Sequence, residues 1–509
     1  MCDLAKRNTC FHSASRRYRT VCRLLLCALA LSCRGAMAQR INTLSPQVQK
    51  YLGASARRVI LAHVQVIDGT GAAPLADRNI LIENGKIADI SPGADQSPVE
   101  GTTVLDLRGY SVMPGIVGMH EHLFYLAFPN LAADYSYDRP VLFHQMSFSA
   151  PRLYLANGVT TARTAGSIDG YTDLRLKDAI EKGLLPGPHL DVTGPYLEGA
   201  GPNPNLQMHQ LTGPEDARET VAYWAERGVT SFKAYAHITR EELKATVQEA
   251  HKRGLKVTGH LCSVTYAEAA EIGIDNLEHG FRADTELDPG KKPDTCSESG
   301  GDDTLEHLVP GSPAANRLFS TLITHHVAVT STLPGAAANV TDLTTDGRPL
   351  VRPDVLEAMA PSLRDAYLYS RNRPRPSPNK EAQMLRRDMD LQRAFVAAGG
   401  LLLAGADPVG IGGNLPGFGD QRQIELLVEA GFRPVEAIRI ATLNGATYLG
   451  RQNEVGSIAI GKNADLVVMK GDPAAHITDI EKVEIVFKDG AGYDTRKLLE
   501  SVKGRYGEY

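Results

Sequence analysis

The chain contains 509 residues, of which 43% are hydrophobic and 22% are charged, values typical of a soluble globular protein. This length allows a large hydrophobic core and more than one domain. The formal net charge of −5 argues against a nucleic-acid partner, because nucleic-acid binding requires a basic face.

Residues 1–38 have the pattern of a signal peptide. Arg16, Arg17, Arg19 and Arg23 precede the ten-residue apolar run 24–33, and Ala36-Met37-Ala38 provides a small-X-small cleavage site. A membrane-spanning helix needs about 20 apolar residues, so we expect no stable membrane anchor. Removal of this segment leaves a net charge of −11 and only Cys262 and Cys296, whose pairing the sequence does not determine. We therefore expect a periplasmic or secreted protein, exported by a route that the sequence leaves open.

Short strands separated by turns are predicted near both ends of the chain. In the N-terminal part, apolar alternation bounded by turn residues predicts strands over 58–67, 79–83, 86–90 and 103–107. Asn84-Gly85 is a strong hairpin signal between the second and third of these. A similar pattern returns over 456–469 and 483–488. We expect a small β-sandwich built from residues 39–113 and 452–509.

The middle of the chain, residues 114–451, alternates helices with short apolar strands. A helix is predicted over 240–253, where Thr239 and Glu242 have the spacing of a capping box, and a strand follows over 255–260. Repeated units of this kind predict an α/β fold with a parallel sheet, most simply a (β/α)8 TIM-like barrel. Two polar segments, 284–312 and 371–380, are expected to be surface insertions.

Polar side chains stand where the predicted barrel strands end. His120 and His122 are two residues apart, so both imidazoles lie on the same side of a strand. Because the active sites of such barrels gather at the C-terminal ends of the strands, we expect later strand ends to contribute to the same site. Those ends carry Lys233, His260, His279 and Asp407.

Each of these residues also has a purely structural interpretation. A single histidine at a strand end is usually a hydrogen-bonded core residue, and Asp407 before Pro408 suits a turn. The joint occurrence of all six at strand ends favours a metal site instead. Four neutral imidazoles and one carboxylate suit Zn²⁺ or a similar divalent ion.

Several segments resemble the amidohydrolase superfamily, in particular its imidazolonepropionase-like and prolidase-like members. The matching segments are residues 114–122, 158–163, 185–188, 254–260 and 461–467. Two positions depart from the family pattern: Gly118 stands where an aspartate is frequent, and Ala162-Arg163-Thr164 replaces the usual Val-Arg-Asp. The resemblance implies a β-sandwich beside the barrel.

The resemblance also implies the composition of the site. It implies that His120, His122, His260 and His279 ligate metal, with Asp407 as ligand and proton shuttle. Lys233 is expected to be N6-carboxylated and to bridge two divalent metal ions, for which we expect zinc. Tyr235, His209 and His237 are candidates for orienting the substrate or stabilising an oxyanion.

The expected function is that of an exported binuclear-metal amidohydrolase. It would use a metal-activated hydroxide to cleave the C–N amide bond of a small amide, an N-acyl amino acid or a peptide-like substrate. The main alternative is a prolidase-like dipeptidase for Xaa-Pro or Xaa-basic dipeptides, while a cyclic-amide hydrolase or a non-catalytic binding barrel fits less well. The sequence leaves the oligomeric state open, including a homo-oligomer.

Overall fold

The structure is a computed structural model that describes residues 43–508, apart from 55, 98–99, 128–141, 202–206, 338–351, 372–377 and 411–412. The predicted signal peptide over 1–38 lies outside the described residues. No helix in the described part of the chain combines the length and the apolar character needed to cross a bilayer.

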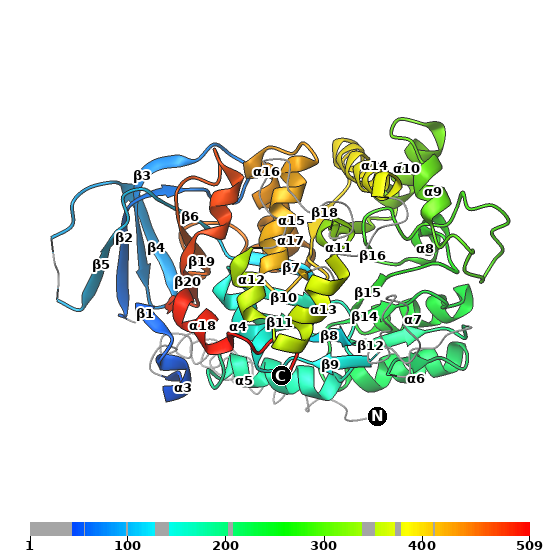
Figure 1. The fold of residues 1–509 in the computed structure, drawn as a ribbon, viewed down its shortest axis with the longest axis horizontal. Helices are drawn as coiled ribbons and strands as arrows, with labels where there is room; N and C mark the ends of the chain where they lie inside the picture. Colours follow the sequence, from blue (N-terminus) through cyan, green and yellow to red (C-terminus); the bar gives the residue numbers. More distant parts are fainter. Residues whose placement is uncertain are drawn as a thin grey trace, which may run out of the picture.

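Both ends of the chain contribute strands to one nine-stranded sheet. The N-terminal strands are β1 (Leu52–Ala54), β2 (Arg58–Val66), β3 (Leu75–Glu83), β4 (Lys86–Pro92), β5 (Thr102–Asp106) and β6 (Tyr110–Pro114). The C-terminal strands are β19 (Leu466–Lys470), β20 (Val483–Lys488) and β21 (Ala491–Asp494). Antiparallel pairing of β6 with β19 joins the two segments, and Figure 1 shows these blue and red strands together at one end of the molecule. The two termini therefore form one sheet, while the two-layer sandwich stays a prediction.

Turn chemistry explains where two of these strands begin and end. β3 and β4 are joined by Asn84 and Gly85, whose φ angles of 52° and 79° match the tight hairpin turn that this dipeptide favours. The segment 456–469 was predicted to contain strand and glycine turns, and Gly456 and Gly461 take positive φ angles of 82° and 90° and form such turns. Only β19 remains extended.

The middle of the chain is a TIM-barrel-like α/β fold built from parallel strands. One parallel sheet contains β7 (Ile116–Glu121), β10 (Val159–Thr164) and β11 (His189–Asp191). The other contains β12 (Thr193–Glu198), β13 (His209–Gln210), β14 (Ser231–Ala234), β15 (Lys256–Gly259), β16 (Asn276–Glu278), β17 (Ala328–Ser331) and β18 (Leu402–Ala404). A separate hairpin pairs β8 (Phe124–Ala127) with β9 (Leu142–Gln145).

The parallel ladders do not close into a continuous ring among the described strands. Backbone hydrogen bonds nevertheless link the two sheets at both seams. Ser167 beyond β10 donates to the carbonyl of Gly194 in β12 at 3.1 Å, and Asp407 beyond β18 donates to the carbonyl of His120 in β7 at 2.9 Å. The predicted strand order around the site is therefore kept, although the complete (β/α)8 closure is not detected.

Helices separate the strands and cover the sheets (Figure 1). Those of the first half are α3 (Pro46–Gln49), α4 (Ser149–Ala156), α5 (Gly170–Glu181), α6 (Pro214–Ala225), α7 (Arg240–Lys252), α8 (Tyr266–Ile272), α9 (Asp302–His307) and α10 (Pro313–Thr324). Those of the second half are α11 (Leu333–Ala337), α12 (Pro353–Ala358), α13 (Pro361–Arg371), α14 (Pro378–Ala397), α15 (Phe418–Glu429), α16 (Pro434–Arg439), α17 (Gly445–Tyr448) and α18 (Thr495–Val502), with a π-turn η2 (Ile440–Asn444) and a 3-10 turn η3 (Ile477–Glu481). The capping box predicted for α7 is present, with Thr239 and Glu242 bonded reciprocally.

The two predicted insertions differ in the structure. Residues 284–312 contain the short helix α9, so this segment is not purely loop. A disulfide between Cys262 and Cys296, with Cα atoms 4.8 Å apart, ties this segment to the loop after β15. The insertion predicted over 371–380 falls between α13 and α14, and residues 372–377 are outside the described part of the chain.

Candidate metal centre

The six side chains predicted from the strand ends lie together where the parallel strands end. Asp407 is at the middle of the group. Its Oδ1 lies 3.0 Å from Nε2 of His122 and 3.6 Å from Nε2 of His120, and its Oδ2 lies 3.8 Å from Nδ1 of His279. Ligand atoms of His120, His279 and Asp407 all lie within 4.8 Å of one another, close enough to hold one cation.

His260 and Lys233, the other two of the six residues, lie next to this group. The rings of His260 and His279 are 4.4 Å apart between centroids, and those of His120 and His279 are 4.6 Å apart. Lys233 is the third residue of β14 and is 1% exposed, with Nζ 3.9 Å from Oε1 of Glu278. The structure therefore brings all six residues to one place.

Two of these residues have backbone conformations that are unusual for their type. His279 has a φ of 66° and Asp407 a φ of 52°, in the left-handed region. His279 directly follows β16, and Asp407 lies shortly after β18. The left-handed backbone conformation turns each side chain toward the strand ends. Such a conformation costs roughly 1–3 kcal/mol, and strain of this kind is concentrated at functional sites.

Burial sets the protonation of the candidate ligands. Desolvation, with a smaller contribution from the Lys233 charge, lowers the pKa of His120 to about 4 and that of His260 to about 3. Burial alone would raise the pKa of Asp407, but His120, His122 and His279 lower it below its usual range. Neutral imidazoles and an ionised carboxylate are the forms that bind a metal cation.

Lys233 is the least satisfied polar group of the site. Its ammonium nitrogen is buried without a hydrogen-bond partner, and burial lowers its pKa to about 8. Nδ1 of His122 is likewise buried without a partner. Orphaned buried groups are rare in folded proteins, so the residues present fit a site that is completed by bound cations and by an anionic group on Lys233.

Glu278 holds His120 in place through a hydrogen bond. It was not predicted from the sequence to be a functional residue. Its Oε2 accepts the Nδ1 proton of His120 at 2.7 Å, which leaves Nε2 free to face Asp407. Its Oε1 accepts from Nη2 of Arg163 at 2.6 Å. Burial alone would raise the pKa of Glu278, but Arg163 and Lys233 keep it well below its ordinary value. Alternation along β16 from Asn276 was the available signal that Glu278 faces the barrel interior.

The two departures from the family pattern have structural explanations. A Cβ atom on Gly118 would lie 2.6 Å from Oε1 of Glu121, so a side chain there would clash. Glu121 is fully buried, and burial together with the nearby Asp420 carboxyl raises its pKa. Arg163, rather than contacting substrate, is 1% exposed and binds the carbonyl of Met119 as well as Glu278.

The three predicted substrate-binding residues lie at different distances from the centre. Tyr235 is adjacent, with its ring 5.0 Å from that of His260. His237 is about a quarter exposed and faces Glu198 at 3.4 Å. The polar contacts of His209, which is 41% exposed, are with Asp216 and Thr220. Their roles stay predictions.

Tyr196 was not predicted. Its buried ring lies 5.2 Å from Tyr235 and 6.5 Å from His122, so the two tyrosines form an aromatic wall beside the centre. Tyr196 lies within β12, away from any motif that would have identified it.

Known proteins are similar to this chain in sequence and architecture. The model of the amidohydrolase family matches residues 111–491. An adenine deaminase from Klebsiella pneumoniae is 25% identical over 427 residues, which cover 83% of this chain and 54% of that protein. An imidazolonepropionase from Parabacteroides distasonis is 38% identical over 63 residues, 12% of this chain and 15% of that protein. The chain thus spans about half the length of the adenine deaminase.

Solved structures resemble the whole described fold. A candidate prolidase from Bifidobacterium longum is 25% identical, with a TM-score of 0.63, and the match covers 88% of this chain and 99% of that one. A Xaa-Pro dipeptidase with methionine bound in its active site has a TM-score of 0.62 at 21% identity, covering 86% of this chain and 100% of that one. At that identity the second likeness concerns the fold alone.

Proposed function

Because this chain belongs to the amidohydrolase family, we propose that it is a binuclear-metal hydrolase that cleaves a C–N amide bond of a small substrate. The observation that carries the proposal is the convergence of buried histidines on one ionised carboxylate, beside a buried lysine that has no hydrogen-bond partner. A barrel that only bound a ligand would not need the Lys233 ammonium to be buried without a hydrogen bond. It would also not need the Asp407 carboxylate to contact three imidazoles.

In this proposal the six residues hold two divalent metal ions. His120, His122, His260, His279 and Asp407 supply nitrogen and oxygen ligands, a set that suits zinc. Lys233, once N6-carboxylated, supplies two anionic oxygens, and its lowered pKa favours the free amine that reacts with CO₂. When bound, such ions supply Lewis-acid chemistry, easing the deprotonation of water and polarising the substrate carbonyl.

Asp407 carries the proton in the proposed mechanism. Its side chain is 25% exposed, whereas those of His120, His122 and His279 are 2%, 3% and 14% exposed, so substrate and water reach it more easily than these histidines. Its carboxylate takes the proton from the attacking water as a general base. It then returns the proton to the leaving nitrogen as a general acid. The neighbouring imidazoles keep it ionised until that step.

We further propose that the substrate is an N-acyl amino acid, a small amide or a peptide-like molecule. The prolidase-type alternative, cleavage of Xaa-Pro or Xaa-basic dipeptides, is supported by the 25% identity to the Bifidobacterium longum protein. Tyr196 and Tyr235 offer an apolar wall that would pack against a side chain or a proline ring. Export to an oxidising compartment is supported by the Cys262–Cys296 disulfide, since such bonds persist there.

A substrate panel tests the proposed function. The purified protein is loaded with Zn²⁺ and bicarbonate and is given N-acyl amino acids, Xaa-Pro and Xaa-Lys dipeptides, lactams and adenine, with release of amine or ammonia as the readout. We expect one class of amide to be cleaved. Asp407→Asn should lower kcat at least about 10³-fold, whereas Asp294→Asn, at an exposed ion pair with Arg240, should not. No cleavage by the loaded protein, or full activity in Asp407→Asn, would overturn the proposal.

A further inference from the structure

A second histidine–carboxylate cluster lies between the barrel and the terminal sheet. His189 begins β11, Asp465 directly precedes β19, and Asp489 lies in the turn between β20 and β21. Nε2 of His189 is 3.3 Å from Oδ2 of Asp489 and 3.8 Å from Oδ2 of Asp465. His189 starts a parallel strand, whereas the candidate metal centre lies where the strands end, so the two clusters are at opposite ends of the barrel.

The histidine of this cluster is oriented as a metal ligand would be. Nδ1 of His189 lies 2.7 Å from Oε1 of Glu181, the last residue of α5. A metal-ligating histidine almost always donates its other ring N–H to a carboxylate, which fixes the tautomer and leaves the second nitrogen free to bind. The same arrangement occurs at His120, whose Nδ1 is 2.7 Å from Glu278.

One carboxylate oxygen of the cluster is buried without a hydrogen-bond partner. The side chain of Asp465 is 1% exposed, and its Oδ1 accepts from the backbone N–H of Asp489 at 2.7 Å. Its Oδ2, by contrast, has no hydrogen-bond donor and is directed at the 3.8 Å gap to His189. An unpaired buried carboxylate oxygen is costly, and this atom is free to bind a cation between Asp465 and His189.

Charge also favours a divalent cation. Lys488 adds a positive charge to the cluster. Its side chain is 7% exposed, and its Nζ lies 3.3 Å from Oδ2 of Asp489. A histidine that ligates a metal must be neutral. In that state the carboxylates of Glu181, Asp465 and Asp489 together with this ammonium carry a formal charge of −2. One divalent ion would cancel it.

The spacing of the ligand atoms is close to that around zinc. Ligands bound at 2.0–2.1 Å in a tetrahedral site lie about 3.3 Å from one another. Nε2 of His189 and Oδ2 of Asp489 are 3.3 Å apart, and the ligand atoms of all three residues lie within 4.8 Å. Only Asp465 would have to move closer.

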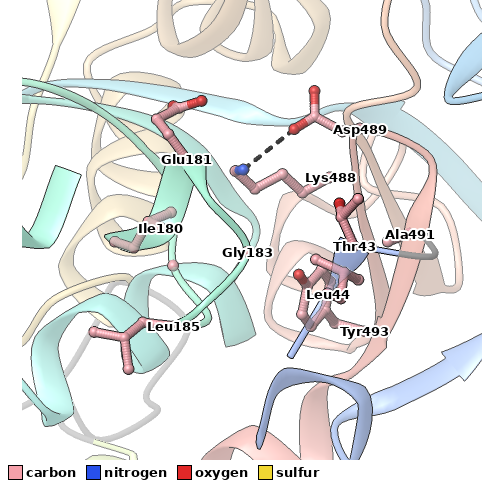
Figure 2. A pocket seen from close by; sticks show the side chains of 11 residues that line it. Thr43, Leu44, Ile180, Glu181, Gly183, Leu185, Lys488, Asp489, Ala491 and Tyr493 are labelled. Atoms are coloured by element: carbon pink, nitrogen blue, oxygen red, sulfur yellow. Dashed lines mark hydrogen bonds and ion pairs between the residues drawn. The ribbon is translucent and has the colours of Figure 1, made fainter. Parts of the chain in front are cut away.

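A small cavity gives room beside the cluster. It has a volume of about 30 Å³, enough for one water or ion, and Glu181, Lys488 and Asp489 form its polar side. Figure 2 shows the Lys488 ammonium directed toward Asp489, with Glu181 on the facing helix. The fourth position of a bound ion could therefore be taken by water from this cavity.

We propose that His189, Asp465 and Asp489 form a structural site for a divalent metal ion that clamps the barrel to the terminal sheet. The site takes a hard-to-borderline ion such as Zn²⁺, with Glu181 orienting the histidine. It is separate from the catalytic ions, and its occupancy stabilises the folded chain because the unfolded chain lacks the site.

Zinc counting tests the proposal. The full chain is stripped with a chelator, reloaded with Zn²⁺, desalted and analysed for zinc per chain, for the wild type, His189→Gln and the double variant H120Q/H122Q. His189→Gln should lose one equivalent and the part of the zinc-dependent rise in Tm that comes from this site. H120Q/H122Q should retain that equivalent and that part of the rise, while it loses zinc from the candidate metal centre. His251→Gln removes a comparable histidine–aspartate pair at 2.9 Å on the surface, and it should match the wild type.

A milder variant covers the case in which His189→Gln does not fold. Glu181→Gln keeps all three ligand atoms and removes only the carboxylate behind His189, so zinc affinity at this site should fall 10–100-fold. Equal zinc content in wild type and His189→Gln, or unchanged affinity in Glu181→Gln, would overturn the proposal. The cluster would then be an ion-pair network closed by a protonated His189.

Discussion

Replacing Arg163 with methionine removes the cation that pairs with Glu278, the carboxylate that binds His120 in the candidate metal centre. Arg163 and Glu278 form a pair that is 1% and 0% exposed, with Nη2 and Oε1 2.6 Å apart. Arg163 also donates from Nη1 to Asn276 at 2.9 Å and from Nε to Met119 at 2.8 Å. Methionine keeps most of the apolar stem and none of these donors.

The expected loss follows from the burial of the partner. Removing one member of a buried ion pair typically costs about 3–5 kcal/mol, because the other charge remains without compensation. Lys233 is the nearest remaining cation, but its Nζ is 3.9 Å from Glu278, beyond hydrogen-bond distance. We therefore expect the free energy of unfolding to fall by about 3–5 kcal/mol.

Urea unfolding of the metal-free protein at pH 7 measures this loss. Arg163→Met combined with Glu278→Gln should recover part of the stability, since the second change removes the uncompensated charge. Arg253→Met, which breaks a partly exposed pair with Glu249, should cost less than about 1 kcal/mol. A loss below about 1 kcal/mol for Arg163→Met, or a double variant less stable than both single variants, would refute the reasoning.

Three further predictions concern Lys233, the disulfide and Asp284. Lys233→Ala should lower the metal content by at least one equivalent per chain, and unchanged stoichiometry in elemental analysis would contradict the bridging role. Cys262→Ser should lower the free energy of unfolding by about 3–4 kcal/mol, because the disulfide closes a loop of 34 residues, and the difference should vanish under reducing conditions. Burial raises the pKa of Asp284 from 3.8 to about 7, so its contribution to stability is greatest below pH 4 and is lost as pH rises to about 7. Asp284→Asn should flatten this part of the stability–pH curve, and an unchanged curve would count against it.

The candidate site could be predicted from the sequence because its members occur at strand ends. His120 and His122 face the centre while Glu121 faces α15, as the alternation along β7 requires. Lys233, His260, His279 and Asp407 follow the same rule on later strands. This rule needs only the strand positions and the parallel arrangement, both of which are visible as patterns in the chain.

Contacts between distant segments could not be predicted in the same way. His189 meets Asp465 and Asp489 nearly 300 residues later, and no local pattern marks that meeting. The partnership of Arg163 with Glu278 depends on how two strands face each other across the barrel.

Metal removal and restoration test the central claim most directly. The protein is stripped of metal with a chelator and assayed on its best amide substrate, then assayed again after Zn²⁺ and bicarbonate are added. Because the chain's own residues supply only positioning and proton transfer, we expect activity to fall at least about 100-fold and to return with the metal. Full activity in the metal-free protein, or in H120Q/H122Q, would contradict the account.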